Sequence, residues 1–83
     1  MDLLKIDVEG FEPNVLRGAE GYLNRGKIRA ILCEFNDYWL TMNGSSSQHL
    51  LEQIRDYGFQ AEVREPDLNR LQSIFFNLYG KGL

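Results

Sequence analysis

The chain of 83 residues is predicted to fold as an open α/β sheet. Three observations support this prediction. Short apolar runs alternate with segments of helical periodicity, the first two runs are far enough apart to hold a helix between them, and glycine or proline punctuates the ends of the segments. Strands that are joined by helical crossovers run parallel, and such crossovers are right-handed. We therefore expect two parallel strands at the start of the chain.

The first predicted strand covers residues 3–8, LLKIDV, and stops before Gly10. A short, continuous apolar run is typical of a strand that is covered on both faces of a sheet, so we expect a central strand. Lys5 is the exception in this run, because a buried ammonium group requires an acid partner or a route to solvent.

The first helix is predicted to begin at Glu12-Pro13 and to end before Gly26. Proline is tolerated in the first turn, where its missing N–H group would be unpaired in any case, and Glu12 is favoured by the positive end of the helix dipole. Apolar residues recur at helical spacing and form one face of this helix. This face consists of Val15, Leu16, Ala19, Tyr22 and Leu23.

The second apolar run, residues 28–35, predicts the next strand, and a loop over residues 36–44 follows it. Serines 45–47 with Gln48 provide an N-cap and a capping box for a second helix, which is expected to end at Gly58.

The last part of the chain predicts two more strands. Residues 61–64 alternate as an edge strand does, and residues 73–79 form a final apolar run. We expect these two strands to pair as a hairpin across residues 65–72.

Composition excludes several classes of protein. A net charge of −3 argues against a surface for nucleic acid or anionic membranes. No apolar run approaches the ~20 residues that span a bilayer, and the first residues lack the pattern of a signal peptide, so we expect a cytoplasmic location. The single cysteine, Cys33, excludes a disulfide framework and a thiolate metal site, and we expect it in the core.

Acidic and amide side chains follow both of the first two strands. Asp7 and Glu9 follow the first strand, while Glu34, Asn36 and Asp37 end the second. Ligands of open α/β sheets bind outside the carboxyl ends of the strands. We therefore expect these side chains at one edge of the sheet, roughly 5–10 Å apart if the strands are neighbours.

Three interpretations of these acids stay open. Asp7 and Glu9 are candidates for a general base, since a carboxylate beside another acid in a dry cleft has a raised proton affinity. Asp7, Glu34 and Asn36 offer only oxygen ligands, which suit Mg²⁺ or Ca²⁺. Alternatively, Glu9 compensates the dipole of the next helix and Asp7 accepts hydrogen bonds from amides in the turn.

Apolar and aromatic residues gather in the loop that follows the second strand. Tyr38 and Trp39 stand there with Leu40 and Met42. Such residues beside a ligand-binding edge form a substrate pocket or lid, or they cover the ends of helices. Together with Lys5, Tyr38 and Trp39 are the substrate-binding candidates. His49 is expected on the solvated surface.

The opening segment, LKIDVEGFEPNVLRGAEGYL, resembles the hallmark segment of the FkbM family of S-adenosylmethionine-dependent O-methyltransferases. In that family a strand ending in K-I-D-V-E-G leads into a helix that contains V-L-[KR]-G-A. The resemblance is dense over residues 5–10 and 15–19. Cys33-Glu34-Phe35, Tyr57-Gly58-Phe59 and Phe76-Asn77-Leu78 are compatible with later parts of the family pattern.

The resemblance implies the C-terminal half of a Rossmann-like class I methyltransferase sheet. Its strands would have the order 4-5-7-6 with the last strand antiparallel, and its helices would lie on both faces of the sheet in three layers. Residues 1–83 would be a single partial domain, because the strand and glycine-rich turn that begin such enzymes are absent from the sequence.

The resemblance also implies a function for the intact parent enzyme. Such an enzyme would use S-adenosylmethionine to methylate a hydroxyl of a sugar or polyketide-like small molecule, and some related O-methyltransferases hold a divalent ion, such as Mg²⁺, at these strand ends. The isolated chain is predicted to be inactive, to bind no cofactor and to self-associate through the uncovered edge of its first strand. The alternatives are a non-catalytic α/β interaction module and a small hydrolase that depends on a divalent metal.

Overall fold

The computed structural model describes residues 3–78 of the chain. Tyr79, which the sequence assigns to the last strand, lies outside the described residues. The elements follow the order β1 (Leu3–Ile6), α1 (Glu12–Gly18), α2 (Glu20–Asn24), β2 (Ala30–Phe35), α3 (Asp37–Met42), α4 (Ser47–Asp56), β3 (Phe59–Ala61) and β4 (Gln72–Leu78).

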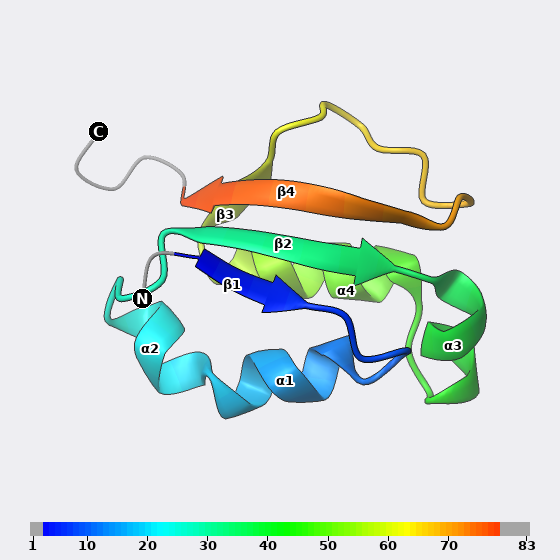
Figure 1. The fold of residues 1–83 in the computed structure, drawn as a ribbon, viewed down its shortest axis with the longest axis horizontal. Helices are drawn as coiled ribbons and strands as arrows, with labels where there is room; N and C mark the ends of the chain where they lie inside the picture. Colours follow the sequence, from blue (N-terminus) through cyan, green and yellow to red (C-terminus); the bar gives the residue numbers. More distant parts are fainter. Residues whose placement is uncertain (1–2, 79–83) are drawn as a thin grey trace.

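The four strands form one mixed sheet in the order β1-β2-β4-β3 (Figure 1). β1 and β2 run parallel, while β4 is antiparallel to both β2 and β3. The α/β class predicted from the sequence is therefore confirmed. The hairpin expected between the last two strands also forms, with Phe59 opposite Leu78.

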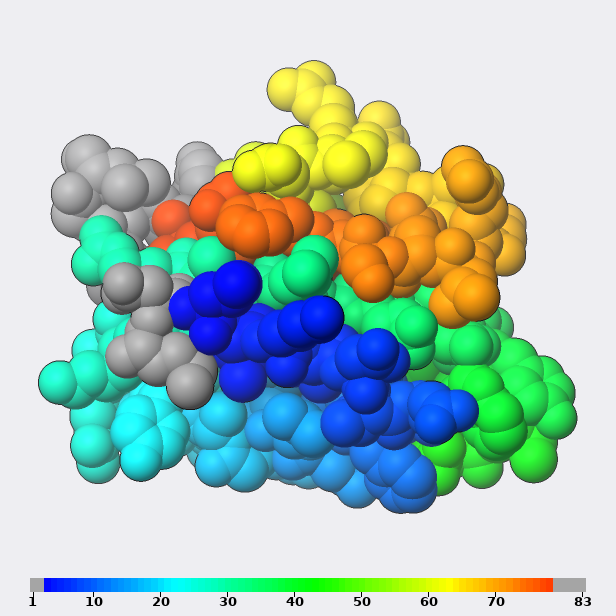
Figure 2. Space-filling view, in the orientation of Figure 1, coloured from blue at the N-terminus to red at the C-terminus, as the bar shows by residue number. Residues whose placement is uncertain are grey.

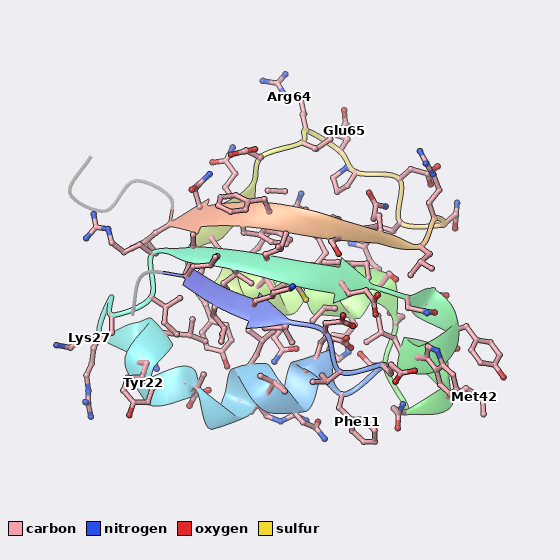
Figure 3. The ribbon with its side chains drawn as sticks, in the orientation of Figure 1. Phe11, Tyr22, Lys27, Met42, Arg64 and Glu65 are labelled. Atoms are coloured by element: carbon pink, nitrogen blue, oxygen red, sulfur yellow. The ribbon has the colours of Figure 1, made fainter. Side chains whose placement is uncertain are left out.

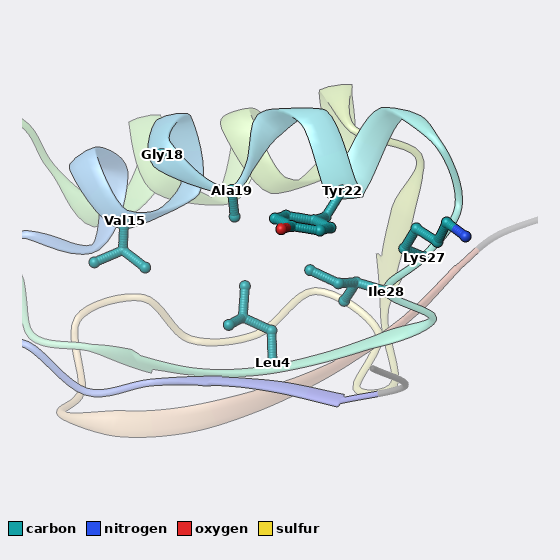
Figure 4. A pocket seen from close by; sticks show the side chains of 7 residues that line it. All are labelled: Leu4, Val15, Gly18, Ala19, Tyr22, Lys27 and Ile28. Atoms are coloured by element: carbon teal, nitrogen blue, oxygen red, sulfur yellow. The ribbon is translucent and has the colours of Figure 1, made fainter.

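The helices α1, α2 and α4 lie on the same side of the sheet, as the view along the sheet in Figure 4 shows. The three-layer arrangement expected from the sequence is therefore wrong for the described residues. The connection from β1 to β2 and the connection from β2 to β3 both advance in the same direction across the sheet. Two right-handed crossovers that advance in the same direction place their helices on the same face of the sheet. The opposite face of the sheet carries no helix among residues 3–78.

The core lies between this helical layer and the covered face of the sheet. Leu16, Leu50 and Ile54 pack from the helices onto strand residues that alternate in register. Those strand residues are Ile6, Ile31, Cys33, Phe35, Ile74 and Phe76. Phe35 and Phe76 stack with their ring centroids 6.0 Å apart. The core position predicted for Cys33 is confirmed, and burial raises the pKa of its thiol, which disfavours the reactive thiolate form.

Among the described residues β1 is an edge strand, as the family resemblance implies for this chain, but one of its faces is exposed, so the expectation that it would be covered on both faces is wrong. Within residues 3–78 it pairs only with β2. Leu3 keeps 45% of its surface exposed and Lys5 is exposed, whereas Ile6 is buried. Figure 2 shows β1, in dark blue, at the surface above α1 and α2. The continuous apolar run predicted a central strand because periodicity alone does not say whether a neighbouring strand is present.

Two helical segments differ from the prediction. The single helix expected from Glu12 to Gly26 is interrupted at Ala19, and the glycines Gly18 and Gly21 that flank the interruption are poor helix formers. The loop predicted after β2 contains a helix instead, α3, which begins where the side chain of Asn36 accepts a hydrogen bond from the backbone of Trp39 at 3.3 Å.

The second predicted helix is confirmed as α4. Its N-cap is Ser46, whose hydroxyl accepts a hydrogen bond from the backbone of His49 at 3.1 Å. A capping box requires glutamate or glutamine three residues after the N-cap, but that residue is His49. The capping box expected with Gln48 therefore does not form. After α4, β3 begins at Phe59 instead of residue 61, because Phe59 is buried against the core.

In the part of the chain that the structure describes, each helix is too short or too polar to cross a membrane.

Candidate active site

The turn between β1 and α1 has an unusual backbone. Glu9 has a φ of 49° and Gly10 a φ of 100°, both in the left-handed region. A Cβ atom on Gly10 would lie 2.4 Å from the carbonyl oxygen of Trp39, which belongs to α3. The turn is therefore pressed against α3, and only glycine fits at position 10.

Glu12 holds this turn in place. Its side chain is 1% exposed, and its two carboxylate oxygens accept hydrogen bonds from the backbone N–H groups of Val8 at 3.2 Å and Gly10 at 2.9 Å. The sequence predicts only a dipole effect for Glu12. The structure adds a bidentate contact that satisfies two amides of the turn, and the signal in the sequence is a carboxylate that directly precedes the helix proline.

The structure brings Asp7 and Glu34 together at the carboxyl end of β1 and β2. Ile6 pairs with Cys33, so the next positions along the two parallel strands are Asp7 and Glu34, on the face of the sheet that carries no helix. Their carboxyl groups lie within hydrogen-bonding reach of each other. The expectation that acids from the two strand ends would meet at one edge of the sheet is confirmed for this pair.

The environment of Glu34 favours its protonated form. Burial raises the pKa of Glu34, and the hydrogen bond and charge of Asp7 raise it further, with smaller effects from the charges of Glu12 and Glu9. Each of these influences raises the pKa of Glu34. A carboxyl group with a raised pKa beside a second acid is the kind of group that exchanges protons with a substrate.

Two other acids or amides predicted for the site have different roles in the structure. Asn36 caps α3 with its side-chain oxygen. The Oδ1 atom of Asp37 accepts a hydrogen bond from the backbone of Ser47 at 2.8 Å and so connects α3 to the start of α4. Glu9 is exposed at the tip of the turn. Asp7 and Glu34 are thus the pair of acids that the fold brings into contact.

The described residues do not fit a dedicated cation site. Within residues 3–78 no three side chains of histidine, cysteine, aspartate or glutamate are arranged to hold a metal ion. Of the predicted ligands, Asn36 caps α3 with its side-chain oxygen, and the raised pKa of Glu34 disfavours the ionised carboxylate that a cation would need. Magnesium binding therefore stays a prediction without structural support.

An aromatic surface flanks the acids. Tyr38 and Trp39 of α3 are 63% and 38% exposed, and their rings meet edge to face with centroids 5.1 Å apart. Because the backbone of Trp39 lies against Gly10, this pair is fixed beside the turn that follows Asp7. Met42 and Phe11 project to solvent at the same end of the molecule (Figure 3).

Lys5 and His49 complete the predicted residues. Lys5 is exposed and, by its register with Leu32, lies on the same face of the sheet as Asp7, two residues earlier in β1. His49 is exposed, as predicted.

Comparison with known proteins identifies one family. The family model described as the Methyltransferase FkbM domain matches residues 1–61, which include β1, the turn, α1 to α4 and β3. No curated protein and no solved structure matches the chain.

Proposed function

Because the chain belongs to the FkbM methyltransferase family, we propose that it supplies the acceptor side of an S-adenosylmethionine-dependent O-methyltransferase. The observation that carries the proposal is the contact between Asp7 and Glu34 at the carboxyl edge of two parallel strands. In open α/β sheets this edge is where ligands bind.

The proposed reaction is a displacement in which an acceptor hydroxyl loses its proton and gains a methyl group. When bound, S-adenosylmethionine would supply the methyl group as a sulfonium. The oxygen of the hydroxyl would form the new bond to the methyl carbon as the bond from that carbon to the sulfonium sulfur breaks, which leaves a neutral thioether, and the carboxylate of Asp7 would take the proton of the hydroxyl. Glu34, whose carboxyl group lies beside that of Asp7, would hold the Asp7 side chain in position. Glu9, which is exposed at the tip of the turn, would contact the acceptor molecule or help to remove the proton from its hydroxyl.

The substrate side of the proposal rests on the surface around the acids. Tyr38 and Trp39 offer an exposed aromatic platform of the kind that packs against the apolar face of a sugar or polyketide. Lys5 offers a cation on the face of the sheet that carries Asp7. These features favour a small molecule with hydroxyl groups as the acceptor.

We further propose that β1, β2, β4 and β3 correspond to strands 4, 5, 7 and 6 of a Rossmann-like class I methyltransferase. The order of the sheet and the antiparallel direction of β4 support this correspondence. The chain would then be a partial domain, and the helix-free face and the free edge of β1 would be where the cofactor-binding half packs. We expect the isolated chain to be inactive.

A calorimetric titration of the isolated chain with S-adenosylmethionine tests whether the chain lacks the cofactor-binding half of the domain. The expected result is no saturable binding below millimolar concentrations, because the sequence contains no glycine-rich turn after a strand. Micromolar affinity would show that these residues form a cofactor site of their own, contrary to the proposal.

The proposed role of Asp7 as general base is tested in a fusion protein. The chain is joined to the upstream half of another FkbM methyltransferase, and transfer of a labelled methyl group is measured. Asp7→Asn is expected to lower kcat by about 10²-fold or more, the usual contribution of a general base. Asp56→Asn, at the exposed end of α4, is the matched control and is expected to leave kcat unchanged. Equal activity of both variants would contradict the role of Asp7.

Two other functions remain as outcomes of these experiments. A folded chain that does not respond to S-adenosylmethionine and gains no activity when joined would support the non-catalytic interaction module. Heat released on addition of Mg²⁺ or Mn²⁺ would support the metal-dependent hydrolase. Neither alternative explains the family match.

A further inference from the structure

The first residues of β4 reach the same edge of the sheet as the two acids. β4 is antiparallel to β2, so it begins beside the end of β2 that leads into α3 (Figure 1). Glu34 of β2 pairs directly with Ser73 of β4. The segment that matches the family model ends at residue 61 and does not include this strand. A residue of β4 therefore lies beside the acids that the article assigns to the acceptor.

Asp7, Glu34 and Ser73 form an edge row across three neighbouring strand positions. Directly paired residues of adjacent strands point to the same face of a sheet, so Ser73 lies on the helix-free face with the two acids. The Cβ atoms of such opposite residues are ~4.5–5.5 Å apart. Ser73 is exposed and Glu34 is half-buried. The edge row therefore presents two carboxyl groups and one hydroxyl side by side.

The edge row is separated from other polar side chains of β2 and β4 on this face. The next pair inward is Leu32 with Phe75, and both residues are apolar and half-buried. Asn77 lies on the same face of β4 but at its opposite end, where it pairs with Ala30. A polar ligand at the carboxyl edge would therefore meet the hydroxyl of Ser73 and not that of a more distant residue.

The segment that leads into Ser73 is held by hydrogen bonds. The backbone N–H of Asn69 donates to Oδ1 of Asp67 at 3.1 Å, and the backbone N–H of Arg70 donates to the carbonyl of Asp67 at 3.3 Å. The side-chain amide of Gln72 donates to the carbonyl oxygens of Asp67 and Arg70. This turn closes onto the first residue of β4, so Ser73 has a defined position beside Glu34.

We propose that Ser73 positions the acceptor by binding a second hydroxyl group of it, while the hydroxyl to be methylated lies at Asp7. The inference rests on the proposed function, because it concerns the same acceptor. A serine hydroxyl both donates and accepts hydrogen bonds, which suits another hydroxyl, whereas an ionised carboxylate only accepts. The acceptor is therefore a molecule with at least two hydroxyl groups, and Ser73 selects which of them is methylated.

The width of the edge row sets the spacing of the two hydroxyls. Neighbouring strands lie roughly 4.8 Å apart, so Asp7 and Ser73 are roughly 10 Å apart along the row, with Glu34 between them. Hydrogen bonds of ~2.8 Å from both ends leave a gap of about 4–5 Å between the two acceptor oxygens. Two hydroxyls on alternate carbons of one ring bridge this gap, whereas a single hydroxyl contacts only one end of the row.

An NMR titration of the full chain with cis-1,3-cyclohexanediol and with cyclohexanol tests the proposal. The two probes have the same ring and differ by one hydroxyl group. The diol is expected to shift the signals of residues 7, 34 and 73 together. It is also expected to bind about fivefold more tightly than cyclohexanol, which is the effect of one additional hydrogen bond.

Ser73→Ala is expected to abolish the fivefold preference, and Ser73→Thr, which keeps the hydroxyl, is expected to retain it. Asn77→Ala is the matched control, because Asn77 is exposed on the same face at the other end of β4. It is expected to leave the preference unchanged. A variant that only loosened the sheet would weaken the binding of both probes equally, so the ratio of the two affinities reports the contact with Ser73.

Two results would overturn the inference. The first is that the folded chain binds the two probes equally or binds neither. The second is a preference for the diol that survives in Ser73→Ala. Methyl transfer by the fusion protein is a separate measurement. If transfer requires Asp7 but the chain does not prefer the diol, only the inference fails. If the chain prefers the diol through Ser73 but the fusion transfers no methyl group, only the catalytic proposal fails.

Discussion

Gly10→Ala is expected to lower the free energy of unfolding by about 3 kcal/mol or more, a large fraction of the stability of a small domain. Two effects add at this position. The φ of 100° is strained for any residue with a side chain, and the new methyl group would overlap the carbonyl oxygen of Trp39 at 2.4 Å. Relief requires α3 to move away from the turn. Urea denaturation followed by circular dichroism measures the loss.

Gly26→Ala separates the two effects. Gly26 also has a positive φ, 70°, but nothing lies within 4 Å of its added Cβ atom. Its loss should therefore be only the backbone strain, about 1 kcal/mol. If Gly10→Ala costs no more than Gly26→Ala, the turn does not press against α3, and the fixed position of the aromatic pair beside Asp7 would be wrong.

Glu12→Ala is expected to destabilise the chain by about 2–5 kcal/mol, because it leaves the part-buried N–H group of Val8 and the buried N–H group of Gly10 without their acceptor. Glu12→Gln keeps the volume but supplies one oxygen acceptor and one N–H₂ donor. One of the two amides would then face a donor, so we expect a loss of about 1–3 kcal/mol. Amide hydrogen exchange at Val8 and Gly10 should accelerate in both variants.

Glu20→Gln is the control for Glu12→Gln. Glu20 is also an acid in the first turn of a helix, but it is exposed and accepts a single hydrogen bond, from the hydroxyl of Tyr57 at 3.0 Å. Its replacement should cost less than about 1 kcal/mol and leave exchange at Val8 unchanged. Similar losses for Glu12→Gln and Glu20→Gln would mean that Glu12 is not the residue that holds the turn.

The sequence predicts the backbone of this fold better than it predicts the site. Apolar runs and glycine stops locate β2, α4 and β4, because burial and capping leave direct traces in residue type. The gathering of Asp7 and Glu34 at one edge also follows from strand order. The exposure of β1 does not follow from its apolar run, since a strand at a sheet edge and one at its centre are built from the same apolar residues, and only the family resemblance implies its uncovered edge.

The contacts that shape the site depend on tertiary structure and leave weaker traces. Glu12 precedes a proline and fits a dipole argument, and its contact with two amides becomes visible only when the turn folds back over it. Asn36 has the chemistry of a metal ligand and of a helix cap. The helix α3, in a segment that the sequence predicts as a loop, decides between them. The roles of Asp7 and Glu9 in catalysis and of Lys5, Tyr38 and Trp39 in binding stay predictions, as does the cytoplasmic location.

A pH titration of the Glu34 carboxyl carbon by NMR tests the central claim, that the two strand ends bring the carboxyl groups of Asp7 and Glu34 into contact. The folded chain is expected to release the proton of Glu34 at higher pH than the urea-unfolded chain does, because burial and Asp7 raise the pKa of Glu34. The folded state then holds this proton more tightly, so the contribution of Glu34 to stability is present at acidic pH and is lost as pH rises through its folded pKa. Asp7→Asn should return the midpoint toward that of the unfolded chain, since it removes the neighbouring charge and offers an N–H donor. A midpoint that is equal in folded and unfolded chains, or that Asp7→Asn leaves unchanged, would contradict the account.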